Sequence, residues 1–363
     1  MAVRWGFVGC GAVAHEVAED FALVSDAVIA GVTARHEDSA QRFAARFSVP
    51  RVHPDLESLL ADPDIDIVYI ATPHHLHHQH ALAALRAGKP VVCEKPFTVD
   101  ARQAREVIEA ARRQQLFCME AMWMRFFPLL REIRARAESG EFGTLRLLRA
   151  DFGYPTPRDA DNRFFNPALA GGALLDRGVY TLSLAQLLLG EPVEVQQLVT
   201  TAETGVDEQI ACLLRYENGA IADLSASLSG LTANTAVLTG DQARVTIHEP
   251  FYRPDRFTIR RATPPASSGQ TSSATGLKSR LLRQPALQRL RQTITPTIKH
   301  WLRDKTVTAH YPGHGYQFEI AEASRCLREG LSESPLMPLD DTLAVMTLMD
   351  RLRPAAHEPE RSA

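Results

Sequence analysis

A glycine-rich motif near the N-terminus has the spacing of a nucleotide-binding turn. Gly9-Cys10-Gly11-Ala12-Val13-Ala14 follows the pattern G-x-G-x-x-A, between a predicted strand and a predicted helix. In this context Gly9 permits a tight turn, and Gly11 lets the backbone approach a pyrophosphate at the helix N-terminus. We therefore expect residues 9–13 to bind a dinucleotide, although a glycine-rich turn in an unrelated α/β protein has the same pattern.

The residues after the second predicted strand select the nucleotide. Sites for NAD usually place an acidic residue there, about 20 residues after the glycines. Here Ala34 and Arg35 stand at the strand end, and Glu37 and Asp38 follow as helix-start residues. A guanidinium can pair a 2′-phosphate through two hydrogen bonds. We therefore expect Ala34 and Arg35 to favour NADP over NAD, the alternative being that Arg35 is an ordinary surface charge.

Polar side chains also follow the third predicted strand. Thr72 and Pro73 end an apolar run and are expected to border the cofactor. Five histidines come next, at positions 74, 75, 77, 78 and 80. Some of them could share a helix face, but no nearby cysteine or acid completes a metal site. We predict no metal here, and interpret the run as a polar pocket rim and a solvated helix face.

Glu94-Lys95-Pro96 ends the fourth predicted strand. A lysine at the carboxyl end of a parallel strand points into the ligand crevice. Lys95 could hydrogen-bond a substrate hydroxyl and the cofactor, and its charge would lower the pKa of a neighbouring phenol. Glu94 could hold Lys95 or the nicotinamide ribose. An ordinary surface ion pair before a turn is the alternative.

The elements that must position these groups alternate between strand and helix patterns. Strands are predicted at residues 3–8, 27–32, 67–71, 90–93 and 117–119, with helices between them. This alternation predicts right-handed βαβ units and a doubly wound parallel sheet. We expect residues 1–122 to form a Rossmann dinucleotide-binding domain of α/β class.

The second half of the chain has a different pattern. Residues 123–363 are predicted to form an α+β domain for substrate binding and oligomerisation, with an open, mostly antiparallel sheet. Glu217-Asn218-Gly219 marks a hairpin between two of its strands. Helix patterns at residues 172–189, 315–330 and 340–352 complete it.

Residues 263–305 fit neither domain. A stretch rich in Ser, Thr, Pro and Gly precedes a segment with eight basic residues and Asp304 as its acid. Leucines and isoleucines at roughly helical spacing favour a surface insertion with amphipathic helices. A contact with a membrane surface or polyanion is the alternative, which Pro285 and Pro296 weaken by breaking a long helix.

Composition limits the class of protein. The 363 residues are 45% hydrophobic with a net charge of −3, which suits two folded domains and gives no reason to bind nucleic acid. The five cysteines are widely spaced, as reduced thiols of a cytoplasmic protein would be. We find no signal-peptide pattern and no apolar run of the roughly 20 residues that a membrane span needs.

In this order, the motifs resemble the Gfo/Idh/MocA oxidoreductase family. The glycine motif, Ala71-Thr72-Pro73 with His77, residues 87–96 (AGKPVVCEKP) and residues 171–180 (GGALLDRGVY) carry the resemblance. It covers nearly the whole chain apart from residues 263–305. It implies a Rossmann domain, a second domain whose open sheet covers the active site, and a Lys-Pro bond that is often distorted or cis. In many members the outer face of that sheet is a subunit interface, so a homodimer or homotetramer is expected.

Tyr180 stands where many family members have histidine. With residues 120–128 (EAMWMRFFP), 315–319 (GYQFE) and 327–330 (LREG), it resembles one branch of the family. That branch contains dimeric dihydrodiol dehydrogenase, NADP-dependent D-xylose dehydrogenase and glucose–fructose oxidoreductase.

The resemblance implies roles for the remaining residues. The cofactor transfers hydride, so the protein has to move the hydroxyl proton of the substrate. A free phenol has a pKa of about 10, and Lys95 beside Tyr180 would lower that pKa toward the operating range. We therefore expect Tyr180 to be the acid–base. Binding roles are expected for substrate at Asp176, Trp123 and Arg163, and for cofactor at His77, Glu94, Lys95 and Arg125.

Each of these roles has a plainer alternative. Asp176 could be a charge at a helix start, and Tyr180 and Trp123 could be packing aromatics. Arg125 could be a surface charge.

The predicted function is an NADP-dependent oxidoreductase acting on a cyclic polyol. The substrate would be an aldopyranose, oxidised at C1 to a lactone, or a trans-dihydrodiol of similar shape; the sequence does not separate the two. An NAD-dependent glycosidase-type member with tightly bound cofactor and a non-catalytic NADP-sensing scaffold are the alternatives. Arg35 and Tyr180 argue against the first, and the pair Lys95 and Tyr180 argues against the second.

Overall fold

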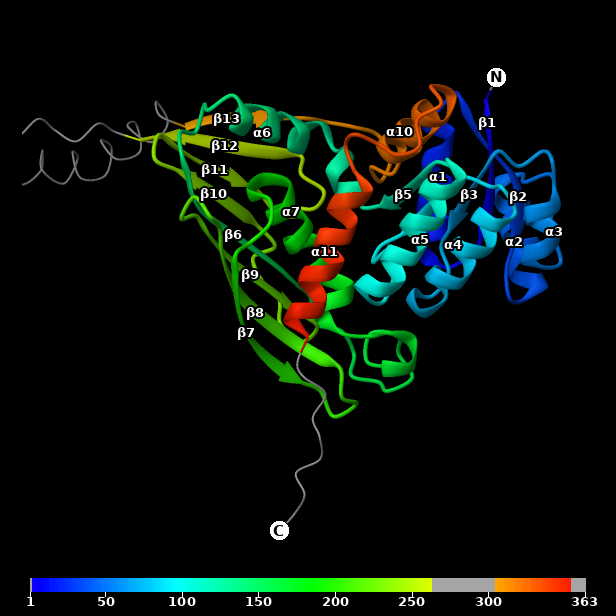
Figure 1. Ribbon diagram of the computed structural model, residues 1–363, viewed down its shortest axis with the longest axis horizontal. Helices are drawn as coiled ribbons and strands as arrows, with labels where there is room; N and C mark the ends of the chain where they lie inside the picture. Colours follow the sequence, from blue (N-terminus) through cyan, green and yellow to red (C-terminus); the bar gives the residue numbers. More distant parts are fainter. Residues whose placement is uncertain (1, 263–303, 354–363) are drawn as a thin grey trace, which may run out of the picture.

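The computed structural model describes residues 2–262 and 304–353, which form two sheets with helices between them (Figure 1). The first sheet is parallel, in the order β2-β1-β3-β4-β5. Its strands are β1 (Val3–Val8), β2 (Ala27–Thr33), β3 (Ile67–Ile70), β4 (Val91–Glu94) and β5 (Cys118–Ala121). β3 is buried along its whole length, as its unbroken apolar sequence predicts.

Helices cover both faces of this sheet, as a doubly wound fold requires. They are α1 (Ala12–Asp20), α2 (Glu37–Phe47), α3 (Leu56–Ala61), α4 (His77–Arg86) and α5 (Ala101–Gln114), with short 3₁₀ turns η1 (Phe21–Leu23) and η2 (His74–Leu76). Two of these helices begin at an aspartate cap. The carboxylates of Asp55 and Asp100 accept the backbone N–H groups of Ser58 and Gln103, so the first turns of α3 and α5 are satisfied.

The second sheet is open and has the order β13-β12-β11-β10-β6-β9-β8-β7. Its strands are β6 (Leu145–Gly153), β7 (Glu194–Thr201), β8 (Asp207–Arg215), β9 (Ile221–Ser227), β10 (Ala236–Gly240), β11 (Ala243–Ile247), β12 (Arg256–Arg261) and β13 (Asp304–Thr308). β6 and β9 are parallel and the other neighbouring pairs are antiparallel. The predicted hairpin joins β8 to β9. The predicted fold class is therefore confirmed.

Four further helices pack between or beside the sheets. They are α6 (Pro128–Glu138), α7 (Val179–Leu189), α10 (Gln317–Arg328) and α11 (Leu339–Leu352), and η3 (Trp123–Phe126) and η4 (Pro167–Leu169) are 3₁₀ turns. In Figure 1, α7 and α11 lie between the two sheets, whereas α10 lies beside the first sheet. The predicted helix over 172–189 begins with a π turn at Leu174–Gly178, which the helical periodicity did not predict.

Helix α10 is tied to helix α1 of the nucleotide-binding sheet. The buried carboxylate of Asp20, at the end of α1, accepts the backbone N–H groups of His314, Gly315 and Tyr316 at 2.8–3.0 Å. A carboxylate at this position also suits the positive end of the α10 dipole. The segment before α10 is thus held against α1, almost 300 residues away in sequence.

The predicted basic insertion lies mostly outside the described residues. Its last two residues, Asp304 and Lys305, instead begin β13, a strand at the edge of the second sheet that pairs with β12. The sequence pattern did not predict this strand, because four of its five residues are polar. All five cysteines are free thiols. Within the described residues, no helix is both long and apolar enough to cross a bilayer.

Candidate active site

Four strands of the first sheet end at the same edge, and most of the predicted cofactor residues follow them. Residues 9–13 follow β1, and Ala34 and Arg35 follow β2. Thr72 and Pro73 follow β3, and Lys95 follows β4. Because all these strands are parallel, their carboxyl ends meet at one edge, and the order changes direction beside β1 and β3. That is where ligands bind in open α/β sheets.

The glycine turn after β1 leaves room for an anion. Gly9 has a φ of +100°, and a Cβ atom there would lie 2.6 Å from the carbonyl oxygen of Ala71. A Cβ on Gly11 would meet no atom within 4 Å, so the space in front of α1 is open. No side chain caps the first N–H groups of α1. These N–H groups and that space fit a pyrophosphate.

Arg35 lies in the open at the end of β2. Its Nε donates to His36 Nε2 at 3.3 Å, and its two terminal amino groups make no hydrogen bond within the described residues. A guanidinium with both terminal groups free can form the paired hydrogen bonds that a phosphate accepts.

Lys95, Asp176 and Tyr180 meet above the end of β4. Lys95 Nζ donates to the backbone oxygen of Asp176 at 3.0 Å and lies 3.6 Å from its carboxylate. The same ammonium lies 4.8 Å from the centre of the Tyr180 ring. Lys95 follows a strand of the first sheet, Asp176 and Tyr180 belong to the segment that packs against the second sheet, and the fold brings the three together.

The π turn at Leu174–Gly178 positions two of these groups. Asp176 lies within it, and Tyr180 follows four residues later in α7, so both face Lys95. The carboxylate of Asp207, at the start of β8, accepts the N–H of Leu174 and holds the beginning of the turn. π turns within helices often occur at functional sites, because the extra residue re-aims the side chains around it.

Asp176 is a buried carboxylate among cations. Burial opposes its ionisation, but the charges of Lys95, Arg163 and Arg177 outweigh that effect and lower the pKa of Asp176 to about 2. Arg163 donates to the Asp176 carboxylate at 3.1 Å, and half of the Arg163 side chain is exposed. Asp176 is therefore ionised at neutral pH, and Arg163 reaches it from the solvent side.

Tyr180 differs from the sequence expectation in its ionisation. Burial raises the pKa of Tyr180 well above its ordinary value, and the hydrogen bond from Trp123 works in the opposite direction. The prediction that Lys95 draws this pKa toward neutrality does not hold here, because the ammonium faces the ring and not the hydroxyl. Tyr180 is thus a protonated phenol at neutral pH.

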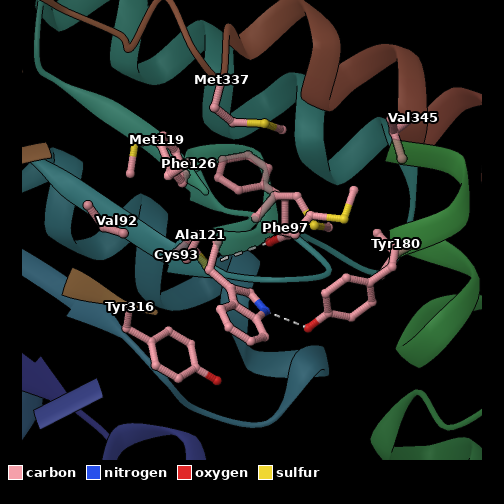
Figure 2. Close-up of a cluster of buried hydrophobic side chains, with 14 of the residues drawn as sticks. Val92, Cys93, Phe97, Met119, Ala121, Phe126, Tyr180, Tyr316, Met337 and Val345 are labelled. Atoms are coloured by element: carbon pink, nitrogen blue, oxygen red, sulfur yellow. Dashed lines mark hydrogen bonds between the residues drawn. The ribbon is translucent and has the colours of Figure 1, made fainter. Parts of the chain in front are cut away.

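Trp123 touches the hydroxyl of Tyr180 directly. Its Nε1 donates to the Tyr180 oxygen at 2.9 Å, the dashed bond that ends at Tyr180 in Figure 2. The phenolic proton itself has no acceptor within the described part of the chain, so it is available to a substrate.

Aromatic residues that the sequence analysis did not single out surround Tyr180. Phe152 and Tyr252 stack on each other with centres 4.3 Å apart, and their rings lie 5.2 Å and 5.6 Å from that of Tyr180. Phe152 shares one face of β6 with buried Leu148 and Ala150, a pattern that would have placed it on the inner face. Tyr252 lies in a loop and carries no comparable signal.

His74 is a second residue whose place was missed. Burial lowers its pKa to about 3, and the charges of Asp176, Lys95 and Arg163 also act on it, so it lies at the polar end of the site. The sequence analysis treated it only as one of five closely spaced histidines on a pocket rim and a helix face.

The side chains of His77 and Arg125 are buried, and their polar atoms contact other groups of the protein. Both ring nitrogens of His77 face backbone oxygens, 2.9 Å from Pro96 and 2.7 Å from Thr72. Arg125 has a fully buried side chain that donates to Ser183 and pairs with Asp341. His77 therefore joins the turns after β3 and β4, and Arg125 joins η3 to α7 and α11.

Glu94 faces inward from the end of β4. The hydroxyl of Tyr69 donates to it, it accepts the N–H of Lys95 at 3.1 Å, and burial raises its pKa. The Lys95-Pro96 bond is cis, as the resemblance implied. These contacts place the turn that carries Lys95 against the sheet.

The two halves of the chain match two parts of one family. Residues 3–122 match the oxidoreductase family with an NAD-binding Rossmann fold, and residues 130–246 match the Gfo/Idh/MocA C-terminal domain. The chain is 30% identical to trans-1,2-dihydrobenzene-1,2-diol dehydrogenase of Mus musculus, over 98% of this chain and 97% of that protein. This protein belongs to the Gfo/Idh/MocA oxidoreductase family.

Solved structures share the fold of this Gfo/Idh/MocA member. A 3-ketoreductase from Actinomadura kijaniata, in complex with NADP and TDP-benzene, has a TM-score of 0.77 at 24% identity, over 97% of both chains. Levoglucosan dehydrogenase, in complex with NADH and levoglucosan, has a TM-score of 0.78 at 22% identity, over 97% of this chain and 96% of the other. The predicted family and enzyme class are confirmed: the protein is an NAD(P)-dependent oxidoreductase acting on CH–OH groups.

Proposed function

We propose that the protein is an NADP-linked dehydrogenase of a six-membered-ring diol or polyol, with Tyr180 as acid–base and Lys95 as its partner. The observation that carries the proposal is the meeting of Lys95, Asp176 and Tyr180 at the carboxyl edge of the nucleotide-binding sheet. When bound, the nicotinamide supplies the hydride acceptor or donor.

Tyr180 moves the proton. In oxidation its oxygen takes the proton of the substrate hydroxyl, and in reduction the phenol returns a proton to the carbonyl oxygen. Because burial keeps Tyr180 protonated, the phenol is ready to act in the reducing direction, and oxidation gains speed as the pH rises. The Lys95 ammonium lies 4.8 Å from the centre of the Tyr180 ring, and its positive charge favours negative charge on the reacting oxygen.

The surroundings of Tyr180 suit a ring that carries adjacent hydroxyls. Phe152 and Tyr252 provide a flat apolar wall on one side. Ionised Asp176 and half-exposed Arg163 provide an acceptor and donors on the polar side. Both trans-dihydrodiols and aldopyranoses present such a ring. The 30% identity to the dihydrodiol dehydrogenase of Mus musculus favours a trans-dihydrodiol as the substrate.

The choice of NADP follows from Arg35. We expect the purified protein to bind NADPH tightly and NADH weakly in titrations followed by nicotinamide fluorescence. Arg35→Ala should weaken the binding of NADPH by roughly 10- to 100-fold, because hydrogen bonds to a charged group are lost. The affinity for NADH should stay unchanged. The control is Arg86→Ala, which removes an exposed arginine from the far end of α4. Equal losses for both nucleotides would show that Arg35 does not bind the 2′-phosphate.

The substrate is tested with two probes in the presence of NADP. Trans-1,2-dihydrobenzene-1,2-diol and D-xylose are offered separately, and formation of NADPH is followed at 340 nm. Turnover of the diol alone would assign the protein to dihydrodiols, and turnover of the sugar alone would assign it to aldopyranoses. Turnover of neither, with NADPH binding intact, would contradict the proposed substrate class.

The outer face of the second sheet is proposed as the contact with a second copy of the chain. The register of β7, β8 and β9 puts Leu198, Leu213 and Ile221 on one face, where they are 81%, 49% and 42% exposed. Apolar residues gathered on one exposed sheet face favour an interface. The cytoplasmic location expected from the cysteines stays a prediction.

The oligomer is tested by light scattering. Leu213→Glu should convert a dimer or tetramer to a smaller species, because the new carboxylate would have to be buried without a partner. Leu231→Glu, at a still more exposed leucine outside the strands, is the control. An unsubstituted protein that is already monomeric would contradict the proposed interface.

A further inference from the structure

Two stacked aromatic side chains, Trp123 and Tyr316, connect the hydroxyl of Tyr180 to helix α1. The Tyr316 ring stacks on Trp123 with centres 4.6 Å apart and planes 22° from parallel. The edge of Phe127 closes another side of the indole, with centres 5.3 Å apart. Figure 2 shows Tyr316 and Tyr180 pointing into the same space from different elements, with the hydrogen bond of Tyr180 between them.

Tyr316 is anchored to the nucleotide-binding helix at two points. Its backbone N–H donates to Asp20 of α1 at 2.8 Å, and its hydroxyl donates to Glu16 of the same helix at 3.2 Å. Asp20 is almost fully buried, so the first contact is shielded from water. α1 begins at Gly11, next to the open space that fits a pyrophosphate.

The indole hydrogen bond acts directly on the group that moves the proton. An N–H donated to a phenolic oxygen stabilises the phenolate more than the phenol. The acidic groups that act on Tyr180 are Glu94 of β4, Asp176 of the π turn and Glu319 of α10, and Lys95 faces its ring. Each of the three acids disfavours the phenolate when it is ionised, and the hydrogen bond from Trp123 opposes burial.

We propose that Tyr316 is a positioning residue, which holds the Trp123 indole against the Tyr180 hydroxyl and ties this hydrogen bond to helix α1. The proposal rests on the acid–base role proposed for Tyr180. It assigns a function to the Gly315-Tyr316 segment, which otherwise only begins α10. It also means that a nucleotide seated on α1 and the state of Tyr180 are linked through two aromatic side chains.

The first test is the pH profile of oxidation, with trans-1,2-dihydrobenzene-1,2-diol and NADP. Turnover should rise with pH as Tyr180 loses its proton. Tyr316→Leu and Trp123→Phe should each move this rise upward by about one pH unit and lower kcat at neutral pH about tenfold, the effect of one hydrogen bond to a charged oxygen. KM for NADP should stay unchanged. An unmoved profile in Trp123→Phe would overturn the proposal.

Tyr311→Leu is the matched control for this test. Tyr311 lies on the same segment and contacts Phe127 and Phe318, but its ring does not stack on Trp123. It should therefore keep the profile of the unsubstituted protein. A shift as large as that of Tyr316→Leu would mean that general loosening of the segment is the cause.

The second test needs no turnover. The emission of Trp123 is obtained as the difference between each protein and the same protein carrying Trp123→Phe. The probe is 2′-phospho-ADP-ribose. It lacks the nicotinamide ring, so no nicotinamide can stack on the indole and change its emission directly. Its binding should change the emission of Trp123 in the unsubstituted protein and in Tyr316→Phe, which keeps the stack.

The change should be lost in Tyr316→Leu while the probe still binds. An equal change in Tyr316→Leu, or no change in the unsubstituted protein with probe bound, would overturn the proposal. The proposed function fails separately: full turnover by Tyr180→Phe would remove the acid–base role, whatever the emission shows. If Tyr180→Phe is inactive but Tyr316→Leu keeps both the pH profile and the emission change of the unsubstituted protein, only the positioning role of Tyr316 is contradicted.

Discussion

Tyr180→Phe should lower turnover by roughly 10²- to 10⁴-fold and leave the affinity for nucleotide unchanged. The substitution removes one oxygen, to which we assign the transfer of the substrate proton in both directions. The ring stays, so its contacts with Phe152 and Tyr252 and the Lys95 ammonium above it are kept. The loss should fall on kcat, because the missing group acts in the transition state and not in binding.

The same variant should also change the pH dependence. Burial places the pKa of Tyr180 above its ordinary value, so oxidation by the unsubstituted enzyme should gain speed as the pH rises. The residual activity of Tyr180→Phe should lack this rise. A rise of the same size in the variant would assign the titration to another group.

Stability provides the check on folding. Without the phenolic oxygen, Trp123 Nε1 is left as a buried donor with no acceptor, which costs about 1–3 kcal/mol of the free energy of unfolding. Tyr216→Phe is the matched control: Tyr216 is equally buried, and its hydroxyl has no partner among the described residues. It should keep full turnover and full stability, both measured by the same assays and by urea unfolding.

Lys95→Met should lower turnover by roughly 10²- to 10³-fold, the usual effect of removing one electrostatic group from an active site. Methionine keeps the length of the side chain but removes its charge and its hydrogen bonds. Asp176 keeps Arg163 and Arg177 as neighbouring cations, so the carboxylate is not left alone in the protein. The phenol loses the positive charge above its ring, and a negative charge on the reacting oxygen is no longer offset.

The control for Lys95→Met is a substitution of Lys89, which also donates hydrogen bonds to backbone oxygens. Lys89 donates to the backbone oxygens of Asp62 and Ile65 at 2.7 Å and 2.8 Å, away from the carboxyl edge of the sheet. Lys89→Met should therefore lose stability but keep kcat. Comparable loss of kcat in both variants would show that the effect of Lys95→Met comes from weakened folding, and unfolding curves would reveal it.

Several features of the site could be predicted because their cause is local. The turn at Gly9 needs a positive φ, and the sequence supplies glycine there between a strand and a helix. Arg35 and Lys95 follow strands, and parallel strands bring their ends to one edge whatever the loops do. The Asn-Gly pair between β8 and β9 determines a hairpin within a few residues.

Other features could not be predicted from local patterns. His77 and Arg125 lie next to motif residues in sequence, yet the fold turns their side chains toward backbone oxygens and toward Ser183 and Asp341. Strand β13 is mostly polar, so its residues lack the apolar alternation that predicts a strand. The π turn before α7 depends on the contact with Asp207, 33 residues from Leu174.

The order of the motifs along the chain predicted the family and the edge of the sheet at which the glycine motif and Lys95 lie, because motifs and strand ends are local features. The pairing of Lys95 with Tyr180 was an expectation from the resemblance to that family. The ionisation of Tyr180 followed only from the tertiary structure. The pKa of Tyr180 depends on burial, on Trp123 and on carboxylates from three other elements, and the ammonium of Lys95 faces the ring instead of the hydroxyl. Electrostatic effects depend on distance and dielectric in space, and neither is written in the spacing of residues along the chain.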